Sequence, residues 1–168
     1  MDLEVEKLLW FQTPVEIEKF RESVDKQVKR VGLDKLKSLA RQAAIVRRNA
    51  YQPYSGYRVG VALLAESGNV YEGVNVEVVD YLATHAEQSA IAQAVANGEY
   101  KANNRKFIEA IAVAHDDRSA PCGSCRQKIL EHCDDALVLV VSPIGEIRGI
   151  TSAASLLPFG FTPKSLGK

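Results

Sequence analysis

The chain has 168 residues, of which 46% are apolar, and its 21 basic side chains are balanced by 21 acidic ones. This length and composition predict one domain with a buried core, and the zero net charge gives the chain no overall attraction to polyanions. The apolar runs are too short to cross a bilayer, and residues 1–4 carry acid where a secretion signal carries basic residues. We therefore expect a cytoplasmic protein without a membrane-spanning segment.

The first predicted element is a helix over residues 14–31, since Pro14 suits the first helical position and Thr13 can cap it. Its apolar side chains recur every three or four positions, at Ile17, Phe20, Val24, Val28 and Val31. A second helix is expected over residues 34–48. Residues 19–48 hold ten basic and three acidic side chains, which we interpret as the solvated face of these helices, with contact to phosphate as the alternative.

A β-hairpin is predicted next, because two valine-rich stretches, 57–65 and 70–75, flank a turn sequence at 66–69. Helices and strands then alternate: a helix at 84–97, a strand at 107–115, a helix at 123–133, strands at 136–142 and 147–151, and a short helix near 152–157. This order favours the α/β class, with a three-layer α/β/α architecture and a mixed sheet of about five strands.

Candidate metal ligands stand at the starts of two predicted helices. His85 opens a His-Ala-Glu triplet, and thirty-seven positions later Cys122 and Cys125 belong to a Pro-Cys-Gly-Ser-Cys segment. A spacing of three places both sulfurs on one helix face, and imidazole and thiolate are preferred zinc ligands. Three protein ligands leave a position open for water, which is typical of a catalytic rather than a structural zinc site.

Two alternatives to a catalytic zinc site have to be weighed. Cys133 as a fourth ligand would close the site, but it lies eight residues past Cys125, or about 12 Å along a helix. A redox pair of Cys122 and Cys125 would leave His85 and Glu87 unexplained. We therefore predict an open zinc site in which Glu87 is the proton shuttle, taking a proton from the attacking water and delivering it to the substrate. His115 and His132 receive no role.

The pattern H-x-E followed by P-C-x-x-C is the signature of zinc-dependent base deaminases. Together with residues 49–64, 73–77 and 156–161, it makes the chain resemble the cytidine deaminase family, in its short, single-domain form, over about residues 36–163. The resemblance implies hydrolytic deamination of cytidine and deoxycytidine to the uridine forms, with release of ammonia, in pyrimidine salvage. It implies one Zn²⁺ per subunit, an N-terminal helical extension at 1–32 and a deaminase domain at 33–168.

The resemblance also implies the substrate-binding residues. Asn75 and Glu77 would hydrogen-bond the ribose hydroxyls, as an amide and a carboxylate can do chemically. Tyr57 would pack against the pyrimidine, and the backbone N–H of Ala86 would contact the base carbonyl.

Two further roles come from the same resemblance. Arg126 would donate to a zinc thiolate or its surroundings, supporting the ligands from behind. Phe161 stands where short members place an aromatic ring in a neighbouring subunit's pocket, so a homo-oligomer, most simply a tetramer, is implied; a local cap on the core is the alternative.

The chain departs from the family pattern at several positions. His85 stands where short members have Cys, and Gln88 where three-cysteine members often have Arg. Exchanging one thiolate for a neutral imidazole removes a negative charge that such an Arg could offset. Tyr57 replaces a usual Phe, Val78 replaces a common Asn, and the loop from 75 to 85 is one residue short.

These departures keep other functions open. A relative acting on a modified cytosine nucleoside or a nucleoside antibiotic is the nearest alternative. A nucleic-acid-editing deaminase would use the same chemistry, but only the basic block at 19–48 speaks for it. A non-catalytic scaffold stabilised by zinc is the third possibility.

Overall fold

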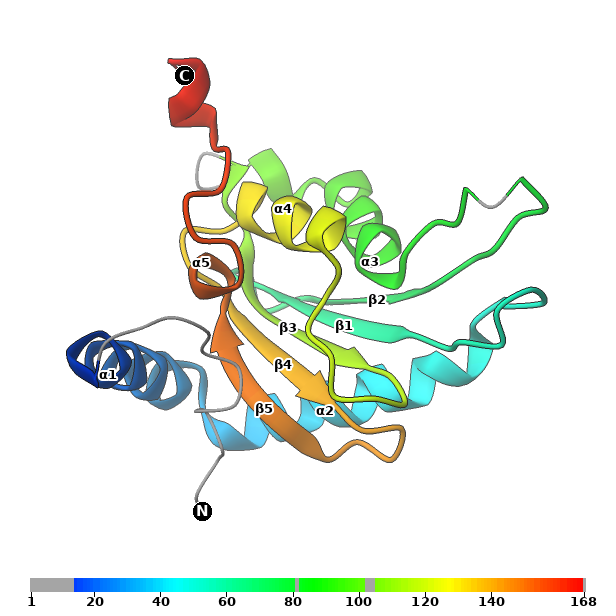
Figure 1. The fold of residues 1–168 in the computed structure, drawn as a ribbon, viewed down its shortest axis with the longest axis horizontal. Coiled ribbons are helices and arrows are strands. Elements are labelled where there is room, and N and C mark those ends of the chain that lie inside the picture. Colours follow the sequence, from blue (N-terminus) through cyan, green and yellow to red (C-terminus); the bar gives the residue numbers. More distant parts are fainter. Residues whose placement is uncertain (1–13, 81, 102–104, 168) are drawn as a thin grey trace.

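The structure is a computed structural model that describes residues 14–80, 82–101 and 105–167 (Figure 1). Its main elements are α1 (Pro14–Val31), α2 (Leu33–Val46), β1 (Gly60–Ala65), β2 (Val70–Val74), α3 (Ala86–Ala96), β3 (Ile108–Ala114), α4 (Gly123–Glu131), β4 (Leu137–Val141), β5 (Ile147–Ser152) and α5 (Ala153–Leu156). Three short 3-10 helices follow α2, α3 and α5, at Arg47–Asn49, Glu99–Lys101 and Pro163–Leu166. The predicted order of helices and strands is confirmed.

The five strands form one mixed sheet in the order β2-β1-β3-β4-β5. Strand β1 is antiparallel to both β2 and β3, and β5 is antiparallel to β4. Strands β3 and β4 are parallel, and the connection between them contains α4. Parallel neighbours need such a crossover, whereas β1 and β2 are joined by the predicted hairpin.

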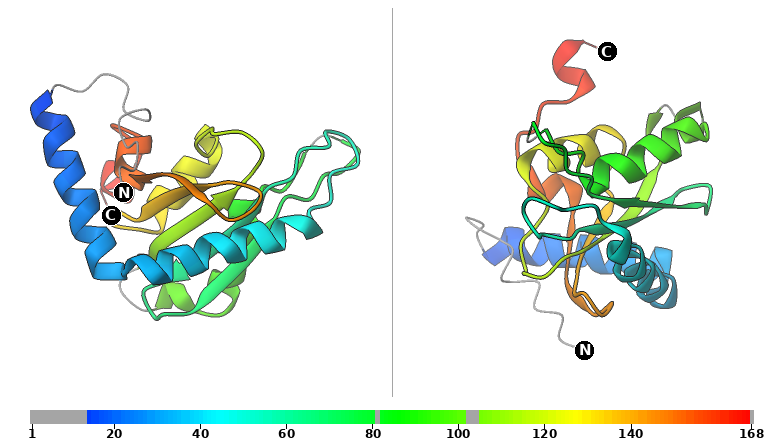
Figure 2. Two further views of the ribbon diagram at one scale, coloured as in Figure 1. Left: turned by 90° about the horizontal axis from the view of Figure 1, so that it is seen from below. Right: turned by 90° about the vertical axis from the view of Figure 1, so that its right-hand side faces the viewer.

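Alternate side chains of the central strands point to opposite faces and divide the core into two clusters. Val61 and Leu63 of β1 pack with α3, α4 and α5, whereas Ala62 and Leu64 pack with α1 and α2. Figures 1 and 2 show these two groups of helices on opposite faces of the sheet. The predicted three-layer α/β/α architecture is therefore confirmed.

The N-terminal helix α1 packs against α2 and the β4–β5 part of the sheet. Val24 and Val31 are buried there, and Phe20 and Val28 are partly buried. The apolar spacing seen in the sequence is therefore the packed face of α1, while the proposed Thr13 cap lies outside the described residues. Within the described ranges, no helix is both long enough and apolar enough to span a membrane.

The first hairpin strand begins later than predicted, at Gly60 instead of Tyr57. The reason lies in Asn75, whose Oδ1 accepts from the Val59 N–H at 2.8 Å and whose Nδ2 donates to the Tyr57 carbonyl at 2.9 Å. This side chain takes two backbone groups that a longer strand would have paired with its neighbour. Residues 57–59 thereby become one wall of a pocket.

Candidate metal centre and substrate pocket

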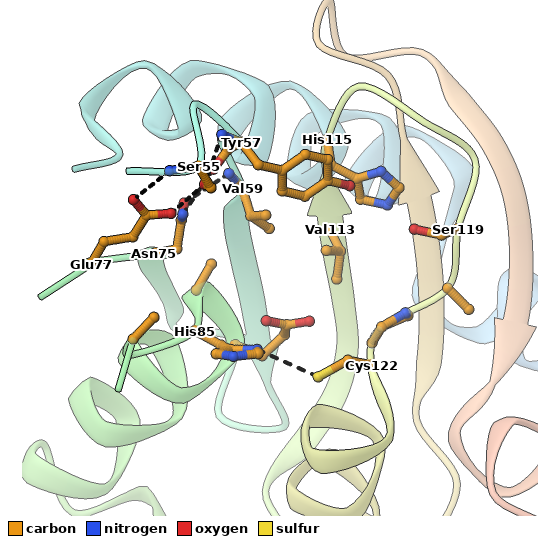
Figure 3. A pocket seen from close by; sticks show the side chains of 15 residues that line it. Ser55, Tyr57, Val59, Asn75, Glu77, His85, Val113, His115, Ser119 and Cys122 are labelled. Carbon is orange, nitrogen blue, oxygen red and sulfur yellow. Dashed lines mark hydrogen bonds between the residues drawn. The ribbon is translucent and has the colours of Figure 1, made fainter. Parts of the chain in front are cut away.

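The three predicted zinc ligands lie together. The Nδ1 atom of His85 is 3.4 Å from Cys122 Sγ (Figure 3) and 3.3 Å from Cys125 Sγ. All three ligand atoms lie within 4.8 Å of one another. In the described part of the chain, no fourth His, Cys, Asp or Glu joins this group. Cys133 is buried in the core cluster formed with α3, α4 and α5, as the sequence predicted.

Two helix N-termini bring these ligands together. His85 and Cys122 are the residues that directly precede α3 and α4, and Cys125 lies in the first turn of α4. The backbone N–H of His85 donates to Gln88 Oε1 at 3.2 Å, which fixes the start of α3. The partial positive charge at both helix starts favours the thiolates that a metal requires. His85 is thus the capping residue of its helix and not a member of the first turn.

Gly73 on β2 lets α3 lie directly on the sheet. A Cβ atom at this position would stand 2.2 Å from the Ala86 carbonyl oxygen and 2.5 Å from the Ala90 nitrogen, both in α3. In addition, the Ser89 hydroxyl donates to the Val74 carbonyl at 2.9 Å. The helix that carries His85 and Glu87 is therefore positioned by close backbone contact with β2.

Replacing Gly73 with alanine is expected to push α3 off the sheet. We expect Gly73→Ala to lower the free energy of unfolding by about 1–3 kcal/mol, as overpacking does, and to reduce zinc content per chain. Urea unfolding and metal analysis measure the two effects. Gly68→Ala is the control for zinc content: the φ of 91° at Gly68 makes alanine unfavourable in the hairpin turn, but a Cβ there meets no atom of α3, so this variant should lose stability and keep its zinc. Full zinc content in Gly73→Ala would contradict the proposed role of this contact.

Glu87 is the second residue of α3 and is 4% exposed, and its neighbour Ala86 is fully buried. Both line the same pocket as His85 and Cys122. Because Ala86 is the first helical residue, its N–H has no partner within the helix and is free to donate to a ligand. Glu87 therefore stands beside the metal ligands without belonging to them, as predicted.

The donor set fits zinc. Burial raises the pKa of the Cys125 thiol, and the negative charge of Glu87 raises it further. Without an ion this thiol therefore stays protonated, and a nearby positive charge is required for it to become the thiolate that binds metal. A divalent ion between His85, Cys122 and Cys125 supplies that charge, and two thiolates with one neutral imidazole make a neutral complex with Zn²⁺.

The ligands lie at one side of a pocket of about 360 Å³. This volume lies within the usual range for small-molecule sites. The pocket is lined by Ser55, Tyr57, Val59, Asn75, Glu77, Ala83, His85, Ala86, Glu87, Val113, His115, Ser119, Ala120, Pro121 and Cys122. The predicted residues Tyr57, Asn75, Glu77 and Ala86 are thus all brought to one cavity with the metal ligands.

Glu77 accepts hydrogen bonds from the backbone N–H groups of Tyr54 and Ser55, at 2.9 and 3.1 Å, and from the Ser55 hydroxyl. The Ser55 hydroxyl is the main reason why the pKa of the Glu77 carboxyl is lowered. Glu77 is therefore a carboxylate at neutral pH and an acceptor for hydroxyl groups.

Tyr57 and His115 form another wall of the pocket. Their rings stack with centroids 6.3 Å apart and an interplanar angle of 27°, and the Tyr57 hydroxyl donates to Asp117 Oδ2 at 3.0 Å. Burial, followed by this hydrogen bond, raises the pKa of Tyr57 to about 12. No role was predicted for His115 from the sequence; the signal that could have identified it is its place directly after the buried strand β3, where polar side chains often reach a site.

Two predicted residues lie outside the pocket. Arg126 donates from Nε to the Pro121 carbonyl at 2.6 Å and from Nη1 to the Leu156 carbonyl at 3.2 Å, so it supports the backbone next to Cys122. Phe161 is 58% exposed, and its carbonyl accepts from Gln127 Nε2 at 2.7 Å. Its ring is not part of the pocket of its own chain.

Residues 33–141 match the family model described as the cytidine and deoxycytidylate deaminase zinc-binding region. The chain belongs to this family. The match contains all three candidate ligands, which confirms the predicted zinc cofactor, with one zinc site per chain.

Similar proteins agree with this assignment. The chain is 38% identical over 135 residues to a cytidine deaminase of Sporosarcina psychrophila, covering 78% of this chain and 94% of the relative. A crystal structure of cytidine deaminase from Burkholderia pseudomallei has 38% identity and a TM-score of 0.67, covering 74% of this chain and 97% of the other. Cytidine deaminase from Mycobacterium tuberculosis follows with 32% identity and a TM-score of 0.60, covering 74% and 94%.

Proposed function

We propose that this protein deaminates cytidine and deoxycytidine hydrolytically to the uridine forms, with release of ammonia. The observation that carries the proposal is the presence of Glu87 beside the His85, Cys122 and Cys125 cluster, in one pocket with Asn75 and Glu77. The similar proteins named above are cytidine deaminases, which supports the same substrate and does not favour a modified nucleoside.

The residues divide the reaction between them. When bound, the zinc ion lowers the pKa of water enough for attack at neutral pH. Glu87 accepts the proton that the attacking water loses and delivers it to the ring nitrogen next to the amino-bearing carbon. Glu87 then takes the proton of the hydroxyl group that has been added to this carbon and delivers it to the departing amino group, so that ammonia leaves and a carbonyl remains. Its burial keeps bulk water from competing for these protons.

The pocket fixes the orientation of a nucleoside at four places. Asn75 and Glu77 bind the sugar hydroxyls at one end of the pocket (Figure 3). The amino-bearing carbon faces His85 and the cysteines, and the Ala86 N–H donates to the base carbonyl. Tyr57 packs against the ring.

A substrate panel tests the proposed function. Zinc-loaded protein is incubated with cytidine, deoxycytidine, cytosine, cytidine monophosphate and an N4-methylated cytidine, and ammonia and absorbance are followed. We expect turnover of the first two and far less of the others, since free cytosine lacks the sugar that Asn75 and Glu77 hold. Preferred turnover of the N4-methylated nucleoside would overturn the assignment, and failure on every pyrimidine nucleoside would favour a non-catalytic scaffold.

Nucleic-acid editing is less well supported. The basic residues at 19–48 lie mainly on α1 and α2, which cover the face of the sheet opposite α3 and α4. Some of these charges already have acidic partners, as Arg47 with Asp116 at 2.6 Å and Arg30 with Glu109 at 3.9 Å. RNA affinity that falls steeply with salt would revive this function.

The active form is, in this proposal, a homo-oligomer and most simply a tetramer. The exposed ring of Phe161, which its own pocket does not use, supports a contact with a second copy. We expect Phe161→Ala to shift the mass measured by sedimentation towards smaller species and to raise KM for cytidine. Tyr100→Ala, which removes another exposed ring, is the control. An unchanged mass and KM would contradict this role of Phe161.

Two further parts of the proposal concern organisation and place. Residues 1–32 are an extension outside the catalytic domain at 33–168, in line with a family match that begins at residue 33. The protein acts in pyrimidine salvage in the cytoplasm, where reducing conditions keep cysteines available for zinc.

A further inference from the structure

Asp117 is at the centre of a polar cluster that the chemistry of deamination does not use. Its Oδ2 accepts from the Tyr57 hydroxyl at 3.0 Å, and its Oδ1 accepts from the Ser119 N–H at 2.7 Å. The same Oδ1 lies 3.0 Å from His115 Nδ1. At that distance the carboxylate is in direct contact with the imidazole, although the pair does not meet the geometry of a hydrogen bond.

Two arginines support the loop that carries Asp117. The Arg148 guanidinium on β5 donates to the carbonyl groups of Asp116 and Asp117 at 2.8 and 2.7 Å. Arg47, after α2, pairs with the Asp116 carboxylate at 2.6 Å and donates to the Arg58 carbonyl at 3.0 Å. The loop after β3 is thus tied to the segment that carries Tyr57.

Asp117 is also the main polar partner of His115. Both ring nitrogens of His115 are buried and accept or donate no hydrogen bond within the described residues. The ring is therefore positioned by its stacking on Tyr57 and by its contact with the Asp117 carboxylate. Since Asp117 also binds the Tyr57 hydroxyl, one carboxylate sets the positions of both rings.

These rings face a defined edge of the substrate if the proposed function holds. The sugar end, the amino-bearing carbon and the carbonyl edge of the pyrimidine are taken by Asn75 and Glu77, by the metal, and by Ala86. The remaining edge carries C5 and C6. Tyr57, His115 and Ser119 line the part of the pocket to which we assign this edge; Figure 3 shows Tyr57 and His115 across the pocket from His85 and Cys122.

We propose that Asp117 is a positioning residue, which fixes the wall formed by Tyr57 and His115 against the C5–C6 edge of the pyrimidine and so limits the groups tolerated at C5. This inference rests on the proposed function. It goes beyond the function because it assigns selectivity at C5 to a residue that touches neither the metal nor the substrate.

The test compares kcat and KM for cytidine and 5-bromocytidine in the zinc-loaded wild type, Asp117→Ala, Asp117→Asn and Tyr57→Phe. We expect Asp117→Ala to raise KM for cytidine about tenfold, the effect of losing one hydrogen bond to a charged group, with little change in kcat. Its preference for cytidine over 5-bromocytidine should fall about fivefold or more. Asp117→Asn keeps an acceptor for the Tyr57 hydroxyl and should retain most of the preference.

A double-mutant cycle separates positioning from general destabilisation. Tyr57→Phe removes the other partner of the hydrogen bond between Tyr57 and Asp117, so this substitution should also lower the preference for cytidine over 5-bromocytidine. The double variant should have nearly the same preference as Asp117→Ala alone. The inference would be overturned if Asp117→Ala lost kcat/KM equally for both substrates, or if Tyr57→Phe kept the wild-type preference. In either case, turnover of cytidine by the wild type would still uphold the proposed function. No turnover of cytidine by the wild type would overturn both. If Asp117→Ala does not fold, Tyr57→Phe decides.

Discussion

Glu87→Gln is expected to abolish turnover of cytidine while the protein keeps its zinc. The amide has nearly the same size as the carboxylate but cannot accept a proton from water or pass one to the ring. General acid–base catalysis contributes about 10²–10⁴-fold, and Glu87 serves several proton transfers, so we expect a loss of kcat at or above the upper end of this range. Single-turnover assays measure the rate, and metal analysis measures the zinc.

The matched control for this substitution is Glu99→Gln. Glu99 is also a buried glutamate, but it accepts hydrogen bonds from Ser67, Asn69 and Tyr71 at the hairpin, away from the pocket. Glu99→Gln should lower stability and leave kcat close to that of the wild type. Wild-type turnover by Glu87→Gln would show that another group moves the protons, and the mechanism would be wrong.

Cys125→Ala is expected to remove both zinc and activity. Cys125 is fully buried and, with Cys122, provides both sulfurs of the site. Two ligands, His85 and Cys122, cannot complete the three-residue arrangement that keeps zinc in enzymes of this kind. We expect less than a tenth of the zinc content per chain that the wild type has, and a corresponding loss of kcat/KM, measured after dialysis against a weak chelator.

The chain provides its own control in Cys133, the third cysteine. Cys133 is as well buried as Cys125 but lies in the apolar core. Cys133→Ala should cost about 1 kcal/mol of stability, the price of a small cavity, and keep one zinc per chain. Zinc retained by Cys125→Ala, or lost from Cys133→Ala, would contradict the assigned ligand set.

The elements of the sheet could be predicted because their sequences repeat a simple pattern. The strand predicted at 107–115 is apolar except for Glu109 and the final His115, and β3 is largely buried on both faces, as such a composition requires. The zinc ligands could also be predicted, since His85, Cys122 and Cys125 follow a spacing that metal chemistry dictates. Short sequence patterns were therefore sufficient to predict the strands, the helices and the metal ligands.

The wall made by Tyr57 and His115 could not be predicted in this way. Its residues lie before β1 and after β3, in two segments that the pairing of Gly60 with Ala114 brings side by side. Arg47 links these segments and Arg148 supports the loop after β3, and neither arginine stands out in the sequence. For the same reason, the two bonds of Asn75 to the backbone at Tyr57 and Val59 appeared only in the structure. Contacts between loops depend on tertiary geometry, which propensity does not encode.

The zinc ligands stand at the starts of both α3 and α4, and this affects the stability of the protein against unfolding and degradation. The two helices begin at residues far apart in the sequence, so a zinc ion bound by both would cross-link two segments of the chain that would otherwise separate more easily. Ion binding to the native state alone adds its free energy to the resistance against unfolding. In a cell that lacks zinc, more chains would remain metal-free and less stable, so degradation would lower the steady-state amount of this protein.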